Sequence, residues 1–307
     1  MGAYVLRRLL AAVPTLLVIV TLAFVLLRMA PGGPFDSDKE MLPEIRASIE
    51  RAYHLDEPLP LQYLRYLGQL LQGDLGPSFQ YPDTRVNELV AQGLPIDLTL
   101  GSLALLLALL LGLPLGMLAA LHRGTWIDRA CSGVALLGIS VPSYVTAPLL
   151  ILVFAVVLRW LPAGDWGEGQ WQHLVLPVIA LSLPYVAYVA RLLRASLLEV
   201  LQAPYLRTAV AKGLPRHRVL LRHALPPALV PLVAFLGPAS VGLLTGSIVV
   251  ETAFGLPGIG RFFVDGAFNR DYTLVLGVTV LYGVMIILAN LLADLLQALL
   301  DPRVRLQ

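Results

Sequence analysis

The stretch from Tyr205 to Pro226, YLRTAVAKGLPRHRVLLRHALP, lies between two apolar runs that are each long enough to cross a bilayer. Between residues 191 and 222 the chain has seven Lys or Arg residues and one acidic residue, Glu199. Because loops on the cytoplasmic side of a membrane are enriched in Lys and Arg, we expect this segment to face the cytoplasm. An ordinary basic connector between two spans would have the same charge, so charge alone assigns no task to it.

The order within this stretch is more informative than its charge. Apolar residues recur at helical spacing in 191–201 and again in 218–225. Gly213 and Pro215 interrupt the sequence between them. The pattern therefore predicts a short, basic helix-turn-helix held against the inner membrane face, which a solvated connector would not need.

The composition identifies the class of protein. Hydrophobic residues make up 57% of the 307 residues and charged residues 14%, whereas soluble domains have roughly 45–50% and about 25%. The chain is therefore a polytopic membrane protein. Its single cysteine, Cys131, excludes an internal disulfide and a cysteine-based metal cluster.

Six apolar segments are candidates for membrane spans, since about 20 helical residues cross the roughly 30 Å hydrocarbon core. They cover about 9–27, 98–121, 131–158, 174–190, 228–250 and 274–300. With these spans, 13 Lys/Arg and four Asp/Glu lie inside, and nine Lys/Arg and 16 Asp/Glu lie outside. This bias predicts that both termini are cytoplasmic.

The same division gives four segments along the chain. Residues 1–29 hold the first span, and residues 30–95 form a polar extracytoplasmic segment. A core of five spans follows at 96–300, with the basic inner loop at 191–226, and residues 301–307 form a cytoplasmic tail.

The polar segment has the pattern of short amphipathic helices, expected at about 44–54, 60–72 and 84–92. It is either a packed cap or a docking surface or gate for a soluble partner. Asp97 follows it, where we expect its side chain to cap the start of the second span.

The fifth span is the first candidate for lining a transport path. It is rich in Pro and Gly, and backbone groups freed by such residues need partners from protein or from a water-filled cavity. Its hydroxyl residues Ser240, Thr245 and Ser247 are the candidate path residues, with Asn290 on the sixth span. Glu251 is a candidate outer gate or partner contact. The alternatives are tight packing through small residues and, for Glu251, a helix-end charge in water.

The sequence also shows what the chain lacks. No span has a Lys, Arg, Asp, Glu or His near its middle, which argues against coupling to ions or protons; Asp97, Glu251 and Asp294 lie at or near span ends. There is no GxxxxGK[S/T] nucleotide motif, so energy must come from another subunit, and the basic inner loop is the obvious entry point. No HExxH or GxSxG motif is present, and no His lies at the depth of the span serines, so we expect no catalysis.

The inner loop resembles the coupling loop of bacterial ABC-import permeases. That family's pattern is Glu-Ala-Ala, three residues, Gly, nine residues, then Ile-x-Leu-Pro. With its Gly on Gly213, its second Ala falls on Ala209 and its closing Leu-Pro on Leu225 and Pro226. Arg207, Thr208 and His223 depart from the pattern.

The resemblance extends over nearly the whole chain and is closest to the first membrane subunit of oligopeptide importers. APGGPF at 30–35, GDLGPSF at 73–79 and GLPGIGRFFVDGAFNRDY at 255–272 are similar to that subunit.

This resemblance implies an all-α integral membrane fold with six transmembrane helices and the type I ABC importer permease architecture, in a bacterial inner membrane. It implies a homologous second permease, two cytoplasmic ATPase subunits, an extracytoplasmic peptide-binding protein and a peptide substrate. ATP and Mg would bind the ATPases, and this chain would bind no cofactor or metal. Contact with an ATPase would fall to Arg207, Thr208, Ala209, Ala211, Lys212, Gly213 and Leu214.

Several alternatives stay open at this point. Within the class, the solute could be a dipeptide, a nickel complex or another small molecule. In a different class, the chain could be a scaffold or signalling subunit without solute flux. An intramembrane enzyme is the least favoured of these readings.

Overall fold

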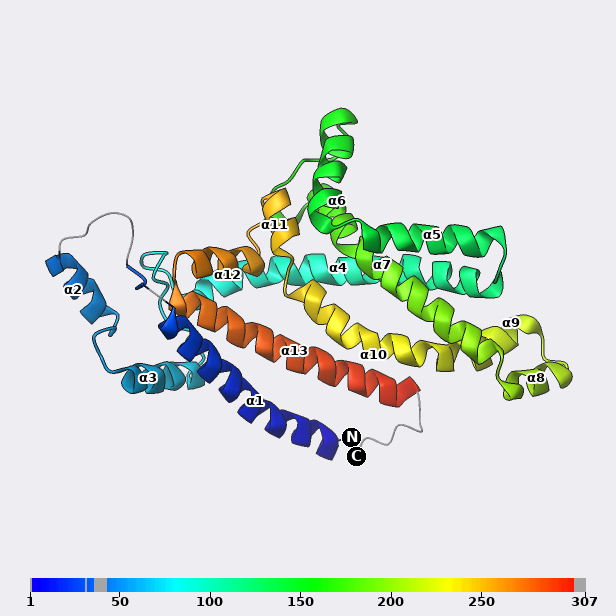
Figure 1. Ribbon diagram of the computed structural model, residues 1–307, viewed down its shortest axis with the longest axis horizontal. Coiled ribbons are helices and arrows are strands. Elements are labelled where there is room, and N and C mark those ends of the chain that lie inside the picture. Colours follow the sequence, from blue (N-terminus) through cyan, green and yellow to red (C-terminus); the bar gives the residue numbers. More distant parts are fainter. Residues whose placement is uncertain (1, 31, 36–42, 301–307) are drawn as a thin grey trace. The chain divides into compact units, whose positions relative to one another are not determined.

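A computed structural model describes residues 2–30, 32–35 and 43–300, so the tail at 301–307 lies outside the described residues. In this part of the chain the regular structure is helical, apart from an isolated β-bridge between Pro77 and Arg85 (Figure 1). Among the described residues, five helices are long and apolar enough to cross a membrane, or six if one bent pair counts as a span. The expected all-α membrane fold is confirmed.

The long helices are α1 (Gly2–Met29), α4 (Val86–Leu121), α7 (Trp171–Leu201), α10 (Leu225–Leu244) and α13 (Tyr272–Leu300). The bent pair is α5 (Trp126–Ser140) and α6 (Ser143–Leu150), which continues in a π-helical stretch, Ile151–Val157. The two parts meet at an angle of 101° (Figure 1). Pro142 lies between the two parts. Proline disfavours the helical conformation of the residue before it, which explains why α5 ends there.

The second span begins earlier than the sequence predicted. The expected helix at 84–92 and the expected span at 98–121 form one helix, α4. Its buried residues Val86, Leu89 and Ile96 keep helical spacing, so the chain has no reason to stop between them. The prediction that Asp97 caps a helix start is therefore wrong, because Asp97 lies inside α4.

The described residues form two compact units, and the first combines residues 2–8, 96–256 and 285–300. In this unit α4 packs closely on α7. A Cβ built on Gly112 would lie 2.7 Å from the Val189 side chain, and one on Gly116 would lie 2.5 Å from the Ala190 carbonyl oxygen. These two glycines, which form a GxxxG pattern, thus allow backbone contact between the helices.

The second unit combines residues 9–30, 32–35, 43–95 and 257–284. It contains α2 (Pro43–Ala52), α3 (Leu59–Leu71) and α12 (Ile259–Phe268), with parts of α1, α4 and α13. The buried carboxylate of Asp271 holds it together by accepting hydrogen bonds from both ends of the unit. The donors are the Ser78 hydroxyl, the Phe79 and Gln80 amides, and the Thr273 hydroxyl and Leu274 amide at the start of α13.

Alanine substitutions at glycines should separate packing from helix propensity. Gly112→Ala and Gly116→Ala should lower the thermal unfolding midpoint in detergent, because overpacking costs about 1–3 kcal/mol. Gly133→Ala in α5 is the control. A Cβ at Gly133 has no neighbour within 4 Å, so the gain in helix propensity of up to about 1 kcal/mol should raise the midpoint. The same sign at all three positions would contradict the close approach of α4 and α7.

Candidate functional site

The basic inner loop folds as a short helix mounted on a buried apolar cluster. Pro204 occupies the first turn of α8 (Pro204–Ala211), a position that tolerates proline. Leu206 is 4% exposed and packs into a cluster that includes Leu193, Leu197, Val219, Ala224 and Ala228. One face of α8 is therefore fixed to the end of α7 and to the region that leads into α10.

The other face of α8 is open. Arg207, Thr208, Ala211 and Lys212 are exposed, as is Gly213, whereas Ala209 and Leu214 pack partly against the buried cluster. The helix ends where Gly213 takes the left-handed conformation with φ +78°. The Tyr205 hydroxyl donates a hydrogen bond to the His223 carbonyl at 3.3 Å, which ties α8 to the returning chain.

The returning chain consists of the short helix α9 (Arg216–Arg218) and a π-helical stretch, Val219–Ala224, which leads into α10. The seven residues expected to contact an ATPase thus form one continuous surface element with a buried side. Sequence spacing predicted the turn at Gly213. It did not show which residues of α8 hold the helix in place, because Leu206 looks like any other apolar residue of the loop.

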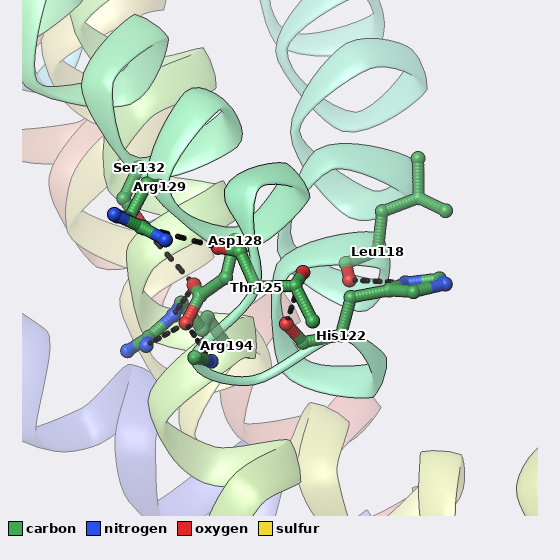
Figure 2. A network of polar contacts seen from close by, with 8 residues as sticks. Leu118, His122, Thr125, Asp128, Arg129, Ser132 and Arg194 are labelled. Carbon is green, nitrogen blue, oxygen red and sulfur yellow. Dashed lines mark hydrogen bonds and ion pairs between the residues drawn. The ribbon is translucent and has the colours of Figure 1, made fainter.

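A partly buried ion pair fixes the neighbouring inner turn, and the sequence did not predict it. The Arg194 guanidinium donates two hydrogen bonds to the Asp128 carboxylate, at 2.7 and 2.8 Å (Figure 2). The Gly124 amide donates to the same carboxylate at 2.9 Å, and the Ser132 hydroxyl at 3.3 Å. This pair ties the start of α5 to α7, the helix that leads to α8. The one signal in the sequence was an acidic residue within a basic inner segment.

The same unit contains a cavity of about 520 Å³ between α7, α10 and α6. Its lining is mostly apolar with hydroxyl groups: Ser143, Tyr185, Tyr188, Phe235, Gly242 and Ser247 are among its residues. Tyr188 from α7 and Phe235 from α10 stack with ring centroids 5.7 Å apart. The sequence reading missed both tyrosines, although the pattern PYVAY at 184–188 places two hydroxyls on one span.

Of the four polar residues expected on a path, Ser247 lines this cavity. The Ser240 hydroxyl donates to the Gly237 carbonyl and the Thr245 hydroxyl to the Val241 carbonyl, both at 2.8 Å. Asn290 lies against α10, where its Oδ1 would be 3.1 Å from a Cβ on Gly237. The structure therefore brings Ser247 to the cavity, where its hydroxyl also accepts a hydrogen bond from the Val250 amide at the start of α11. The other polar groups lie in helix contacts.

The fifth span is broken where the cavity ends. Helix α10 stops at Leu244, and α11 (Ile248–Phe254) starts after Gly246, whose φ is +77°. The carboxylates of Asp97 and Glu251 both lie beside Gly246, and each residue is 1% exposed. The alternative reading of Glu251 as a helix-end charge in water is wrong, because the side chain is buried away from bulk solvent. A gate role for Glu251 stays a prediction.

Asp294 was the remaining candidate for an ion-coupling acid. Its carboxylate accepts hydrogen bonds from the Arg8 guanidinium at 2.5 Å and the Tyr4 hydroxyl at 2.8 Å. Arg8 thus compensates this charge and joins the first turns of α1 to α13.

Two family models match the chain. The model described as "Binding-protein-dependent transport system inner membrane component" matches residues 112–306, and its N-terminal companion matches residues 1–100. The chain belongs to this family. The family expected from the sequence is confirmed, and the protein is a multi-pass inner-membrane permease.

Relatives cover the whole of this permease. The oligopeptide transport system permease protein OppB of Escherichia coli (strain K12) is 50% identical over 302 residues, which are 98% of this chain and 99% of that protein. The dipeptide transport system permease protein DppB of Bacillus subtilis (strain 168) is 42% identical over 306 residues, 100% of this chain and 99% of that protein.

Solved structures show the same fold. An inward-facing form of the MetNI methionine ABC transporter matches with a TM-score of 0.54 and 20% identity. The match covers 69% of this chain and 96% of that one. The permease architecture expected from the sequence is thus supported by structure as well as by sequence.

The turn at Gly213 gives a test of α8. An L-residue in the left-handed conformation costs roughly 1–2 kcal/mol, whereas space is available there. Gly213→Leu should abolish transport by the assembled complex without affecting membrane insertion, and Gly213→Asn should retain most transport, because Asn tolerates this conformation. Uptake and complex assembly would be measured together. Loss of insertion or assembly in Gly213→Leu would count against a coupling role.

The ion pair of Asp128 and Arg194 gives a second test. Arg194→Gln leaves a buried carboxylate without its cation and should cost about 2–3 kcal/mol, less than a fully buried pair, since 33% of the Arg194 side chain is exposed. The thermal midpoint should fall, and the double variant with Asp128→Asn should recover part of it. Arg191→Gln, at an exposed position on the same helix, is the matched control. Equal effects of Arg191→Gln and Arg194→Gln would refute the structural role of the pair.

Proposed function

We propose that this chain is the membrane permease subunit of an ATP-driven importer and forms half of a translocation path for oligopeptides. The observation that carries the proposal is the packing of α8. This helix has an exposed basic face, and its buried Leu206 packs against α7. The 50% identity to an oligopeptide permease over 98% of the chain supports oligopeptides as the substrate class.

The energy enters from other subunits in this proposal. The sequence has no nucleotide-binding loop, so ATP and Mg belong to two cytoplasmic ATPase subunits, and the permease itself is not catalytic. Closure of the ATPases around ATP moves α8, and the packed cluster below Leu206 carries the movement into α7 and α10. Such a switch needs two helix arrangements whose balance a remote ligand shifts.

The cavity between α7 and α10 is the proposed half-path, completed by a homologous second permease. Peptides share a backbone but differ in side chain, so a permissive path needs apolar walls with scattered hydroxyl groups. Tyr185, Tyr188 and Ser247 supply such hydroxyls in the cavity. An extracytoplasmic binding protein delivers the peptide, and both termini of the permease face the cytoplasm.

Dipeptides are the second candidate substrate, because a dipeptide permease is 42% identical over the whole chain. Uptake of labelled peptides of two to five residues distinguishes the two. The scaffold alternative predicts no flux of any solute.

Purification of the tagged chain in mild detergent tests the proposal as a whole. We expect a second permease and two ATPases to co-purify. We expect peptide-loaded binding protein to raise ATP hydrolysis by this complex. A chain that purifies from gently solubilised membranes without any ATPase would contradict the proposal.

A bulky side chain in the cavity tests the path itself. Ser247→Trp should slow peptide uptake by reconstituted complexes about tenfold, because an overpacking cost of even 1.4 kcal/mol in the transport barrier has that effect. Ser102→Trp is the control, since Ser102 is exposed on α4 and does not line the cavity. Unchanged uptake in Ser247→Trp would remove this cavity from the path.

A further inference from the structure

The second compact unit contains a cavity of about 290 Å³ that is not part of the path proposed above. Its walls come from the end of α1, from α3, from the segment 74–85 and from the start of α13. Aromatic rings form much of the lining, namely those of Phe24, Tyr53, Tyr66, Phe79 and Tyr272. Three arginines line it as well.

Arg28 differs from the other two arginines of this cavity. Arg65 donates to the Glu57 carboxylate at 2.6 Å, and Arg85 donates to the Asp74 carboxylate at 2.5 Å. Within residues 2–30, 32–35 and 43–300, Arg28 has no carboxylate partner. Its partly buried guanidinium instead lies against two rings, 5.4 Å from the centre of Phe24 and 4.9 Å from that of Tyr272.

The surroundings hold this guanidinium in place. The Tyr272 hydroxyl donates to the Gly32 carbonyl at 2.9 Å, which fixes one of the two rings that contact Arg28. Stacking on two rings leaves the guanidinium edge, with its N–H donors, available to a planar anion. A carboxylate matches that edge with two parallel hydrogen bonds.

Two buried residues shape the cavity. Gln62 donates from Nε2 to the carbonyls of Leu55 and Glu57, at 3.0 and 2.7 Å, and so fixes the turn before α3. Tyr66 is 5% exposed, and its hydroxyl has no hydrogen-bond partner among the described residues. Burial raises the pKa of Tyr66, so the phenol stays neutral and keeps a proton to donate.

We propose that this cavity is a carboxylate site that receives one acidic side chain of the extracytoplasmic binding protein, with Arg28 as the cation. The proposal rests on the proposed function. The volume is just below the range of about 300–1,000 Å³ for drug-sized ligands, so the site fits one residue and not an oligopeptide. Glu57 and Asp74 pair with Arg65 and Arg85, and we therefore assign the incoming carboxylate to Arg28, the third arginine of the lining.

A lipid phosphate is the competing anion, and the position of the walls argues against it. Arg65, Arg85 and His54 line the cavity from polar segments outside the long apolar helices. The site is therefore lined on one side by the polar extracytoplasmic segment, which is accessible to a soluble protein.

The test is the affinity of the binding protein for the full complex in nanodiscs. Arg28→Gln should weaken it about tenfold or more, the effect of losing one charge-assisted hydrogen bond. Arg28→Lys, which keeps the charge but loses the planar fork, should have an intermediate effect. Arg51→Gln is the control, because Arg51 is exposed on α2 and does not line the cavity. In Arg28→Glu, an Asp or Glu to Arg change on the binding protein should restore binding.

Three results would overturn the inference. Affinity that is unchanged in Arg28→Gln excludes the site as a docking contact. An effect that disappears when anionic lipid is omitted assigns Arg28 to a lipid phosphate. A change in the peptide concentration for half-maximal uptake at unchanged binding-protein affinity assigns it to the carboxylate of the substrate. If the wild-type complex shows no stimulation by the binding protein at all, the proposed function fails instead.

Discussion

The contact on which the account depends is the packing of Leu206 into the cluster of Leu193, Leu197, Val219, Ala224 and Ala228. A short, basic helix has little stability of its own, because helix nucleation is unfavourable and most helices in proteins depend on tertiary packing. Burial of the Leu206 side chain removes apolar surface from water, and this packing fixes α8 in position. Without that fixed side, movement of the exposed face would not reach the spans.

Helix α7 links this packing to the cavity. At one end it supplies Leu193 and Leu197 to the cluster under α8, and further along it supplies Tyr185 and Tyr188 to the cavity wall. The Asp128–Arg194 pair joins α5 to the same helix near the inner loop. One continuous helix thus connects the proposed input surface with the proposed path, and the ion pair couples a neighbouring helix to it.

Glycine spacing and apolar composition predicted those parts of the fold that depend on the local sequence. The turn at Gly213 followed from its spacing, and the apolar segment at 131–158 followed from its composition. The start of α4 was placed too late. The residues before Asp97 look polar in sequence, and the burial of Val86, Leu89 and Ile96 depends on partners far away in the chain. Asp97 and Glu251 were placed at or near span ends, and the sequence did not show that both side chains lie buried beside Gly246.

Side-chain pairing across the chain was the least predictable feature. Asp128 and Arg194 are 66 residues apart, and neither one suggests the other without the fold. The positions of the hydroxyl residues along the fifth span did not show which of them face the cavity. Ser240 and Thr245 bond to carbonyls of their own helix, a use that apolar surroundings favour.

The most direct test of this account is the ratio of ATP hydrolysed to peptide imported by reconstituted complexes carrying Leu206→Ala. Leu221→Ala, at an exposed leucine of the same loop, is the control. Truncation of a buried leucine costs about 2–5 kcal/mol of packing, so α8 should remain on its partner but transmit less movement. The account predicts continued hydrolysis with a sharp fall in uptake, and hence a higher ratio for Leu206→Ala alone. An unchanged ratio in complexes that assemble normally would contradict it.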